Sequence, residues 1–169
     1  RAAGRQPGAL ILPPAQGTGA RGSEKIAIRA LNVFVDVDYT LLSASGLLRP
    51  NARELCEALT SAGHGLYVWS GMGIRRDEIA GHKLGGFVSG YAVKPVEDYL
   101  GALERTPPPA WPDLVIDDHD AIVRALGGVV IRPYFFVDPS DTELRHAASM
   151  VLEFAETGGC ENRRSCSRP

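Results

Sequence analysis

Residues 33 to 42 read VFVDVDYTLL, a β-type apolar run that leads into two aspartates, Asp36 and Asp38. A carboxylate beside a hydrophobic core is unfavourable unless it is ion-paired, hydrogen-bonded or bound to a metal. Two carboxylates so close in the chain also repel each other. This stretch therefore predicts a core strand whose carboxyl end carries a polar site.

Strand-like and helix-like patterns alternate through the rest of the chain. Short apolar runs are typical of buried strands, and longer amphipathic segments are typical of helices. The strand-like runs lie at residues 30–35, 65–69, 87–89, 114–116 and 129–131, and the helix-like segments at 50–62, 75–82, 95–103, 120–126 and 141–156. This order predicts an α/β fold, a Rossmann-like three-layer sandwich with a mostly parallel central sheet and helices on both faces.

At 169 residues the chain is long enough for one well-packed domain, which we expect between residues 25 and 157. Residues 1–24 are rich in Gly, Ala, Pro and Arg without periodicity, and we expect them to form a flexible leader. Residues 158–169 have a similar character and are expected to form a flexible tail.

Charge and cysteine content restrict the kinds of binding partner and cellular location that we expect. Residues 31–157 carry ten basic and eighteen acidic side chains, a balance that suits a divalent cation and does not favour nucleic acid. The three cysteines have no zinc-ligand spacing and make a disulfide framework improbable. No apolar window approaches the length of about 18 residues that a membrane span needs. We therefore expect a cytoplasmic protein without a membrane partner.

Four short polar segments each follow a predicted apolar segment. They are DVDYT at 36–40, SG at 70–71, KP at 94–95 and DD at 117–118. In open parallel sheets, ligands bind outside the carboxyl ends of the strands. We therefore expect these segments at one edge of one sheet, where they would supply a nucleophile, a hydroxyl group, a cation and a pair of carboxylates.

These residue types suit phosphoryl transfer. A phosphate monoester is an anion, so a carboxylate can attack it only when positive charge neutralises both groups. Mg²⁺ prefers oxygen ligands, commonly one or two carboxylates with waters and a phosphate oxygen, and Asp117 and Asp118 can supply carboxylates. An aspartate nucleophile also needs a separate proton donor for the leaving group. The residues alone do not say which of Asp36 and Asp38 has which role.

The segment DVDYT resembles the DxDxT signature of the haloacid dehalogenase superfamily of phosphohydrolases. The order of SG, KP and DD matches the later motifs of that family, and the resemblance covers residues 31–132. It implies a Mg²⁺-dependent phosphatase in which Asp36 is the nucleophile that forms an aspartyl-phosphate and also binds the metal. It further implies that Asp38 is the general acid and base, with its backbone carbonyl on the metal.

The remaining motifs receive their roles from the same resemblance. Ser70 would donate a hydrogen bond to the transferring phosphoryl group, and Lys94 would neutralise the nucleophile and the phosphate. Asp117 and Asp118 would complete the Mg²⁺ site. Thr40 would brace the loop after the first strand, and Thr40 and Gly71 are expected beside the bound substrate.

Members of this family often insert a cap domain between the first and second motifs or between the second and third. Only 33 residues separate Asp36 from Ser70, and 23 separate Ser70 from Lys94. We therefore expect a capless, open site. Such a site favours a bulky or macromolecular phosphorylated substrate, or closure by a partner subunit in a homo-oligomer, and residues 41–48 and 72–76 are the expected substrate contacts.

Other functions use the same residue types. A receiver-type phosphoacceptor also has an acidic pocket, a Ser or Thr and a Lys, but it needs no acid or base two residues past its phosphoacceptor, where Asp38 lies. A non-catalytic binding module on the same fold is the other alternative, and Tyr39, a bulky residue for the signature, is a small hint of it. Sugar phosphates, nucleotides, phosphoproteins and nucleic-acid ends all stay open as substrates.

Each short motif also has a purely structural interpretation. Asp117 and Asp118 can cap the following helix, and Ser70 can cap the turn after its strand. Arg75 and Arg76 could contact a phosphate, but an RRDE run is more typical of a solvated helix face.

Overall fold

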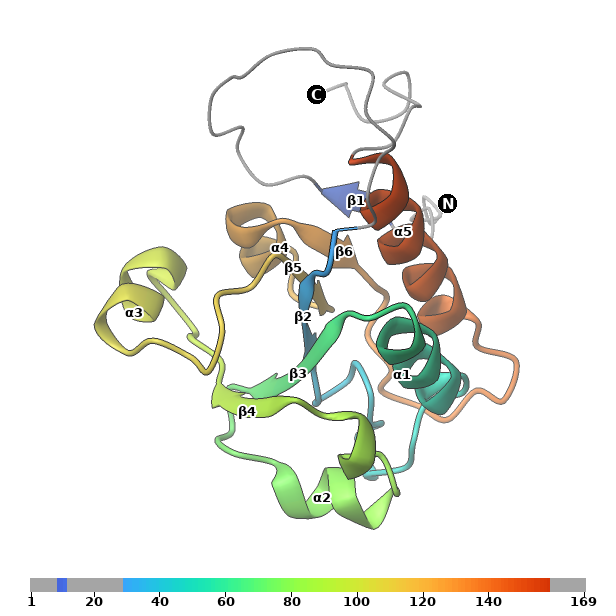
Figure 1. The fold of residues 1–169 in the computed structure, drawn as a ribbon. Coiled ribbons are helices and arrows are strands. Elements are labelled where there is room, and N and C mark those ends of the chain that lie inside the picture. Colours follow the sequence, from blue (N-terminus) through green and yellow to red (C-terminus); the bar gives the residue numbers. More distant parts are fainter. Residues whose placement is uncertain (1–8, 12–28, 159–169) are drawn as a thin grey trace, which may run out of the picture.

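The computed structural model describes residues 9–11 and 29–158, and a six-stranded sheet lies at its centre (Figure 1). The strands are β1 (Ala9–Ile11), β2 (Asn32–Asp36), β3 (Gly65–Ser70), β4 (Gly90–Val93), β5 (Leu114–Asp117) and β6 (Gly128–Val130). The helices are α1 (Ala52–Ser61), α2 (Arg76–Gly81), α3 (Tyr99–Arg105), α4 (Asp120–Leu126) and α5 (Glu143–Thr157), and a 3-10 turn, η1, covers Gly85–Phe87.

Five strands of the sheet are parallel, in the order β6-β5-β2-β3-β4. Val35 of β2 lies opposite Val68 of β3 on one side and Ile116 of β5 on the other. The chain runs from β2 outward to β4 and then returns to β5 on the opposite side of β2. The strands β2 and β5 therefore form the switch point at which the connections reverse direction. This arrangement confirms the predicted Rossmann-like α/β layout.

Strand β1 lies within residues 1–24, for which the sequence predicts a flexible leader. It pairs with β6 in the antiparallel direction, with Leu10 opposite Val129. The edge of β6 would otherwise present unpaired N–H and C=O groups, which favour the addition of an apolar strand. The leader prediction is therefore wrong for these three residues. Residues 1–8, 12–28 and 159–169 lie outside the described part of the chain.

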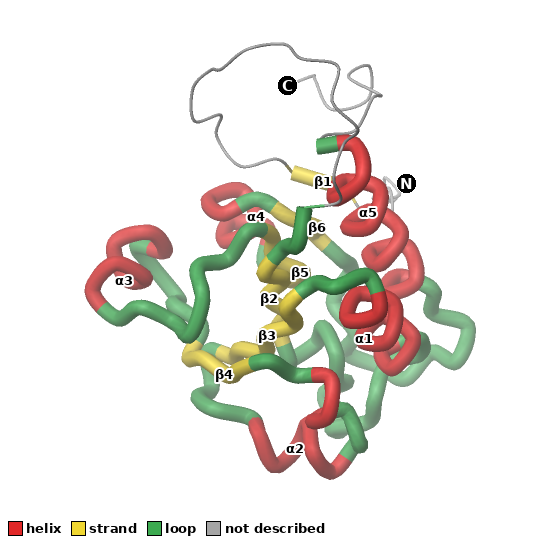
Figure 2. The backbone as a smooth tube through the Cα atoms, in the orientation of Figure 1, coloured by secondary structure: helices red, strands yellow, loops and turns green. Residues whose placement is uncertain are grey.

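Side chains of the central strand alternate between two apolar layers. Val33 and Val35 face the layer that α1 and α5 cover, whereas Phe34 faces the layer that α3 and α4 cover. Figure 2 shows these helix pairs on opposite sides of the sheet. The Phe34 ring stacks on Tyr67, with 4.8 Å between the ring centroids. Full burial of each such side chain contributes about 1.5–3 kcal/mol, so both layers hold β2 in the middle of the domain.

Strand β4 lies later in the chain than the apolar pattern predicts. Residues 87–89 read as a strand, but Phe87 ends the turn η1 and packs against the core from there. Strand pairing begins at Gly90, where a Cβ atom would lie 3.1 Å from Cδ1 of Tyr67. Glycine allows this close approach of the backbone to the ring, so the strand begins at a residue that carries no apolar signal.

Helix α3 begins at Tyr99 rather than at Pro95. Asp98, directly before the helix, has a left-handed φ of 42°, which a right-handed helix cannot contain. Residues 95–98 therefore form a loop after β4. This loop brings Pro95 and Val96 to the candidate site.

The connections between the motifs contain no separate cap domain, as predicted. The residues between Asp36 and Ser70 form the loop over residues 37–51, α1 and most of β3. Those between Ser70 and Lys94 form α2, η1 and β4. Neither connection therefore adds a folded unit over the carboxyl edge of the sheet.

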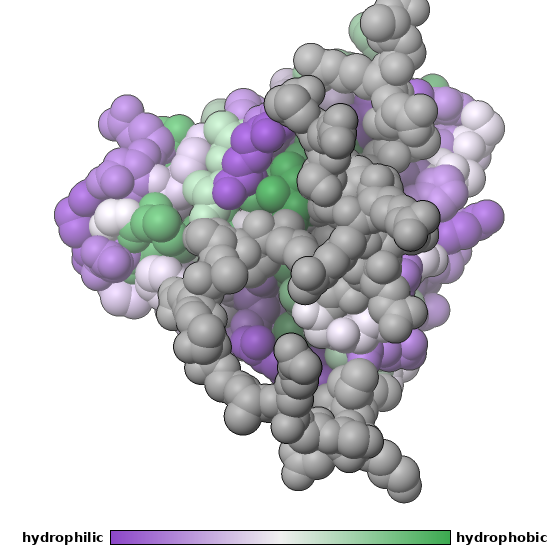
Figure 3. All heavy atoms as spheres, turned by 90° about the horizontal axis from the view of Figure 1, so that it is seen from above, coloured by the Kyte–Doolittle hydropathy of each residue, from purple (hydrophilic) through white to green (hydrophobic). Residues whose placement is uncertain are grey.

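The described surface has a mixed character. Figure 3 shows hydrophilic and hydrophobic residues interspersed over the part of it that is visible from above. No helix among residues 29–158 is both long and apolar enough to cross a membrane.

Candidate active site

The carboxyl ends of neighbouring strands bring the predicted polar residues together. Asp36 ends β2, Ser70 ends β3, Asp117 ends β5, and Lys94 directly follows β4. Because these strands are parallel neighbours, the four residues lie at one edge of the sheet, where β2 and β5 form the switch point.

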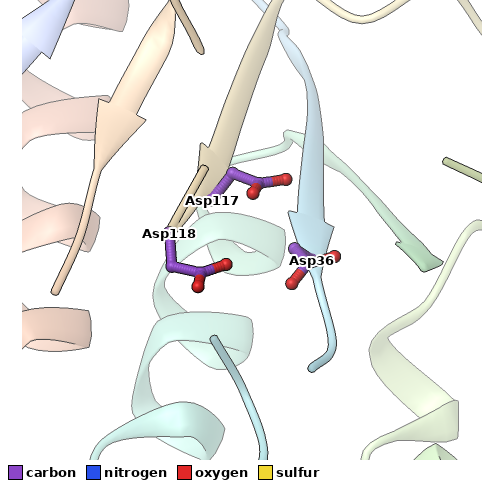
Figure 4. A group of neighbouring side chains, drawn as sticks. All are labelled: Asp36, Asp117 and Asp118. Atoms are coloured by element: carbon purple, nitrogen blue, oxygen red, sulfur yellow. The ribbon is translucent and has the colours of Figure 1, made fainter. Parts of the chain in front are cut away.

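Three carboxylates face one another at this edge (Figure 4). Asp36, Asp117 and Asp118 each offer one oxygen, and these oxygens lie within 4.8 Å of one another. Asp36 and Asp117 are buried, with 1% and 0% of their surface exposed, and Asp118 is partly buried. Buried carboxylates so close together require positive charge nearby.

Lys94 supplies part of that charge. Its Nζ lies 2.7 Å from Oδ1 of Asp36 and 3.1 Å from Oδ2 of Asp117. The backbone N–H of Lys94 donates to the carbonyl of Ser70 at 3.0 Å, which holds the residue at the end of β4. One ammonium group for three carboxylates leaves the site with an excess of negative charge.

The pKa values reflect this excess. Burial raises the pKa of Asp36 to about 8, Asp117 adds to the increase, and Lys94 opposes it. Burial also raises the pKa of Asp117 and that of Asp118. Burial alone would lower the pKa of Lys94, but Asp36 and Asp117 outweigh it and raise that pKa. The lysine is charged at neutral pH, and a further cation would favour ionisation of the carboxylates.

Two buried oxygens of the carboxylate group have no hydrogen-bond partner among the described residues. They are Oδ2 of Asp36 and Oδ1 of Asp118. Both oxygens of Asp117, in contrast, accept from Lys94, and its Oδ1 also accepts from the N–H of His119 at 2.9 Å. Buried carboxylate oxygens without a partner fit a hard cation such as Mg²⁺. Asp36 and Asp118 thus have an oxygen free for a metal, whereas Asp117 holds Lys94.

Asp38 lies apart from this group although it is only two residues from Asp36. Its Oδ2 accepts from the hydroxyl of Ser70 at 2.6 Å, and its Oδ1 lies 3.2 Å from Nη1 of Arg75. Its side chain is 31% exposed. Asp36 and Asp38 therefore occupy different environments, a condition under which two carboxyl groups can take different roles.

The turn after β2 produces this separation. The carbonyl of Val37 accepts the N–H groups of Leu41 and Leu42 at 3.0 and 2.9 Å. Tyr39 has a left-handed φ of 61°, and its carbonyl accepts the N–H of Tyr134 at 2.7 Å. The chain therefore turns sharply after Asp36.

Ser70 and Thr40 are fully buried and do not line the cavity beside the site. The Ser70 hydroxyl donates to Asp38 and accepts the N–H of Met72 at 2.9 Å. The N–H of Thr40 donates to the carbonyl of Val37, but its Oγ1 has no hydrogen-bond partner among the described residues, so the role of Thr40 in bracing the loop stays a prediction. Its position gives no support to the predicted contact between Thr40 and substrate, and the predicted contact between Ser70 and a phosphoryl group stays a prediction.

A cavity of about 240 Å³ opens beside the carboxylates. Asp36, Asp38, Lys94 and Asp118 are its charged lining residues, and Gly71, which is expected beside the bound substrate, also lines it. The other lining residues are Tyr39, Met72, Pro95, Val96, Tyr99, His119 and Ile122. A ligand in this cavity would meet Asp36 and Asp38 together.

Arg49 is a supporting residue that the sequence reasoning missed. Its side chain is fully buried, donates to both carboxylate oxygens of Asp141 and reaches the carbonyl of Thr40 at 3.4 Å. Its charge also opposes the increase in the pKa of Asp118 that burial causes. The partners Arg49 and Asp141 are 92 residues apart, and no local pattern in the sequence signals their contact.

A comparison with protein-family models finds no match, and a comparison with curated proteins finds none either. The interpretation of the site therefore depends on its geometry and on the short motifs that form it.

Proposed function

We propose that this chain is a Mg²⁺-dependent phosphatase of the haloacid dehalogenase type, which hydrolyses a phosphate monoester through an aspartyl-phosphate on Asp36. The proposal depends above all on the unpartnered oxygens of Asp36 and Asp118 beside Lys94, at a cavity that Asp38 also lines. Such a set offers a nucleophile, positive charge and a separate proton carrier in one place.

Asp36 is the nucleophile in this mechanism. One of its carboxylate oxygens forms a bond to phosphorus while the bond from phosphorus to the leaving oxygen breaks. Lys94, 2.7 Å from Oδ1 of Asp36, reduces the repulsion between the carboxylate and the anionic phosphoryl group. Asp117 keeps the ammonium group in position through both of its oxygens.

Asp36 and Asp118 are the residues that would hold Mg²⁺. When bound, the metal supplies positive charge that favours the ionised carboxylates and stabilises charge on the phosphoryl oxygens. With a pKa of about 8, Asp36 is mostly protonated at pH 7 when only the protein's own charges act on it. A protonated carboxyl group is a poor nucleophile, so the site requires the additional charge.

Asp38 transfers the protons. As an acid it gives its proton to the leaving oxygen, and as a carboxylate it then takes a proton from a water molecule. The oxygen of that water bonds to phosphorus, the bond between Asp36 and phosphorus breaks, and inorganic phosphate leaves. Ser70 and Arg75 hold the Asp38 carboxylate at the cavity, which favours both transfers by orientation.

The short connections around the site support a substrate that does not need to be enclosed. The cavity has no cap domain over it in the described residues. We therefore propose a bulky or macromolecular phosphorylated substrate, or closure of the site by a second copy of the chain.

The receiver-type alternative receives less support. Flavodoxin-like sheets have the strand order 2-1-3-4-5, whereas the parallel strands here, numbered from β2, follow the order 5-4-1-2-3. Asp38 also lines the cavity, where a phosphoacceptor domain has no use for an acid or base. Both observations favour the hydrolase.

Hydrolysis of p-nitrophenyl phosphate, measured with and without Mg²⁺, tests the proposal. Asp36→Asn should abolish the metal-dependent turnover because an amide cannot form the aspartyl-phosphate. Asp38→Asn should lower kcat by about 10²–10⁴-fold because the proton carrier is lost. Asp138→Asn is the matched control, since Asp138 is exposed and does not line the cavity.

If the folded wild-type protein shows no turnover, the proposed phosphatase function is contradicted. In that case the same sample is incubated with acetyl phosphate and its mass is measured. Stable phosphorylation of Asp36 would indicate a phosphoacceptor domain, and an unchanged mass would indicate a non-catalytic binding module.

A further inference from the structure

Apart from its carboxylates, Lys94 and His119, the cavity is lined largely by apolar surface. Met72, Val96 and Ile122 line it together with Tyr39 and Tyr99. Met72 and Val96 are 77% and 71% exposed, which makes them available to a ligand.

Val96 also lies close to the residue after Ser70. A Cβ atom on Gly71 would be 3.3 Å from Cγ1 of Val96. The loop after β4 and the loop after β3 therefore meet at this point, and the valine forms an apolar rim next to the phosphoryl-transfer residues. A group joined to the transferring phosphate would contact this rim.

The cavity offers no unpaired Lys or Arg to a second anionic group. Lys94 is the only Lys or Arg among its described lining residues, and it is already paired with two carboxylates. Arg75 nearby is paired with Asp38, and Arg76 lies over the ring of Tyr91, 4.9 Å from its centroid. A second phosphate on the substrate would therefore enter an acidic site in which His119 is the one remaining basic side chain of the described lining.

Polyhydroxylated groups also fit the apolar part of the cavity lining poorly. Sugar hydroxyls that face Met72, Val96 and Ile122 would find no hydrogen-bond partner there, and outside the charged residues only the side chains of Tyr39, Tyr99 and His119 could exchange hydrogen bonds with them. Hydroxyl groups that lose their hydrogen bonds to water and gain none in the protein lower the binding affinity.

We propose that the part of the leaving group that enters the cavity is small, uncharged and apolar, such as an aromatic ring joined to the ester oxygen directly or through one carbon. The volume of about 240 Å³ is below the range of about 300–1,000 Å³ typical of drug-sized ligands, so a phosphoryl group and one ring fill it. This inference depends on the proposed phosphatase function, because it names the substrate class of the same site.

A comparison of kcat/KM for benzyl phosphate and for glucose 6-phosphate tests the inference. Both are esters of primary alcohols, so their leaving groups have similar reactivity and differ mainly in polarity. We expect kcat/KM for benzyl phosphate to be at least about 10-fold higher, which is the discrimination that a few apolar contacts provide. An equal or higher kcat/KM for glucose 6-phosphate would overturn the inference.

Val96→Asn tests the apolar rim itself. The two side chains have similar volumes, so the variant should lower the ratio of the two kcat/KM values by about 10-fold without closing the cavity. Val137→Asn is the matched control, because Val137 is 49% exposed and does not line the cavity. A ratio that Val96→Asn leaves unchanged would show that the rim does not contact the leaving group.

Calorimetry with two phosphonates gives a readout that needs no turnover. In the presence of Mg²⁺, benzylphosphonate should bind about 10-fold more tightly than methylphosphonate, and equal affinities would overturn the inference. If neither phosphate ester is hydrolysed but benzylphosphonate still binds selectively, the phosphatase function fails while the apolar site stands.

The ring can belong to a free small molecule or to a side chain of a larger one. Phenyl phosphate and an end-blocked peptide with one phosphotyrosine share the same type of leaving group and separate these sources. A higher kcat/KM for the peptide would indicate that the ring is a side chain of a larger molecule, and a lower value would indicate a free small molecule. Both outcomes agree with an apolar leaving group.

Discussion

Replacement of Arg49 by methionine should destabilise the protein by about 3 kcal/mol. The guanidinium group is fully buried and pairs with Asp141 through two hydrogen bonds, of 2.9 and 2.8 Å. Arg49→Met keeps much of the side-chain volume but leaves a buried carboxylate without its main partner, which costs about 3–5 kcal/mol. We expect the lower end of this range because Arg132 still reaches Asp141 at 3.2 Å.

Urea unfolding, followed by the fluorescence of the buried Trp69, measures this loss. With a slope of about 2 kcal/mol per molar urea, the midpoint should fall by about 1.5 M. The double variant Arg49→Met, Asp141→Leu removes both charges and should recover most of the stability, because an apolar pair can replace a buried ion pair. A midpoint shift below about 0.5 M, or a double variant as unstable as the single one, would refute the reasoning.

The stabilising contribution of Asp141 depends on pH. Burial raises the pKa of Asp141, but the hydrogen bonds and charge of Arg49 outweigh it, so this pKa lies below the ordinary value of 3.8. A carboxyl group with a lowered folded-state pKa stabilises the protein above its ordinary pKa and loses that contribution as the pH falls through the folded value. The contribution of the Asp141 carboxylate to the stability of the wild type should therefore be constant near neutral pH and decrease below pH 3.8.

Three further changes address other parts of the molecule. Gly128→Ala should prevent folding, as judged by circular dichroism, because a Cβ atom there would lie 1.9 Å from the carbonyl oxygen of Val115; a native spectrum would show that the backbone can adjust. Asp118→Asn should weaken Mg²⁺ binding in calorimetry by at least about 10-fold, and an unchanged affinity would remove Asp118 from the metal site. Arg75→Met should lower kcat by about 10-fold with little change in KM, because Asp38 loses one of its two partners; a change in KM alone would instead assign Arg75 to substrate binding.

The sequence predicts most of the carboxyl edge of the sheet because apolar runs and polar residues meet there abruptly. Asp36 and Asp117 each terminate a run of buried side chains, and parallel pairing then brings them together without further information. Ser70 follows the same rule, whereas the strand before Lys94 was expected at residues 87–89 and lies at Gly90–Val93. Residues whose position depends on strand ends were therefore predictable.

Contacts between distant loops were not predictable in this way. The pairing of Arg49 with Asp141 joins the loop before α1 to the loop before α5, and neither loop has a periodic pattern. The start of α3 depends on the left-handed backbone of Asp98, which the residue type alone does not predict. The apolar rim at Val96 follows from that start, because a helix from Pro95 would have oriented this loop differently.

Asp36 and Asp38 are compatible with folding because each has its own partners. The turn after β2 leaves Asp36 beside Lys94 and Asp38 beside Ser70 and Arg75, so the two carboxylates do not share one environment. Their side chains are 2% and 31% exposed. A nucleophile benefits from the buried position beside fixed positive charge, whereas a proton carrier must reach both the leaving oxygen and an incoming water molecule. The proposed roles of Asp36 as nucleophile and Asp38 as proton carrier therefore have a physical basis in this chain that does not depend on its resemblance to a family.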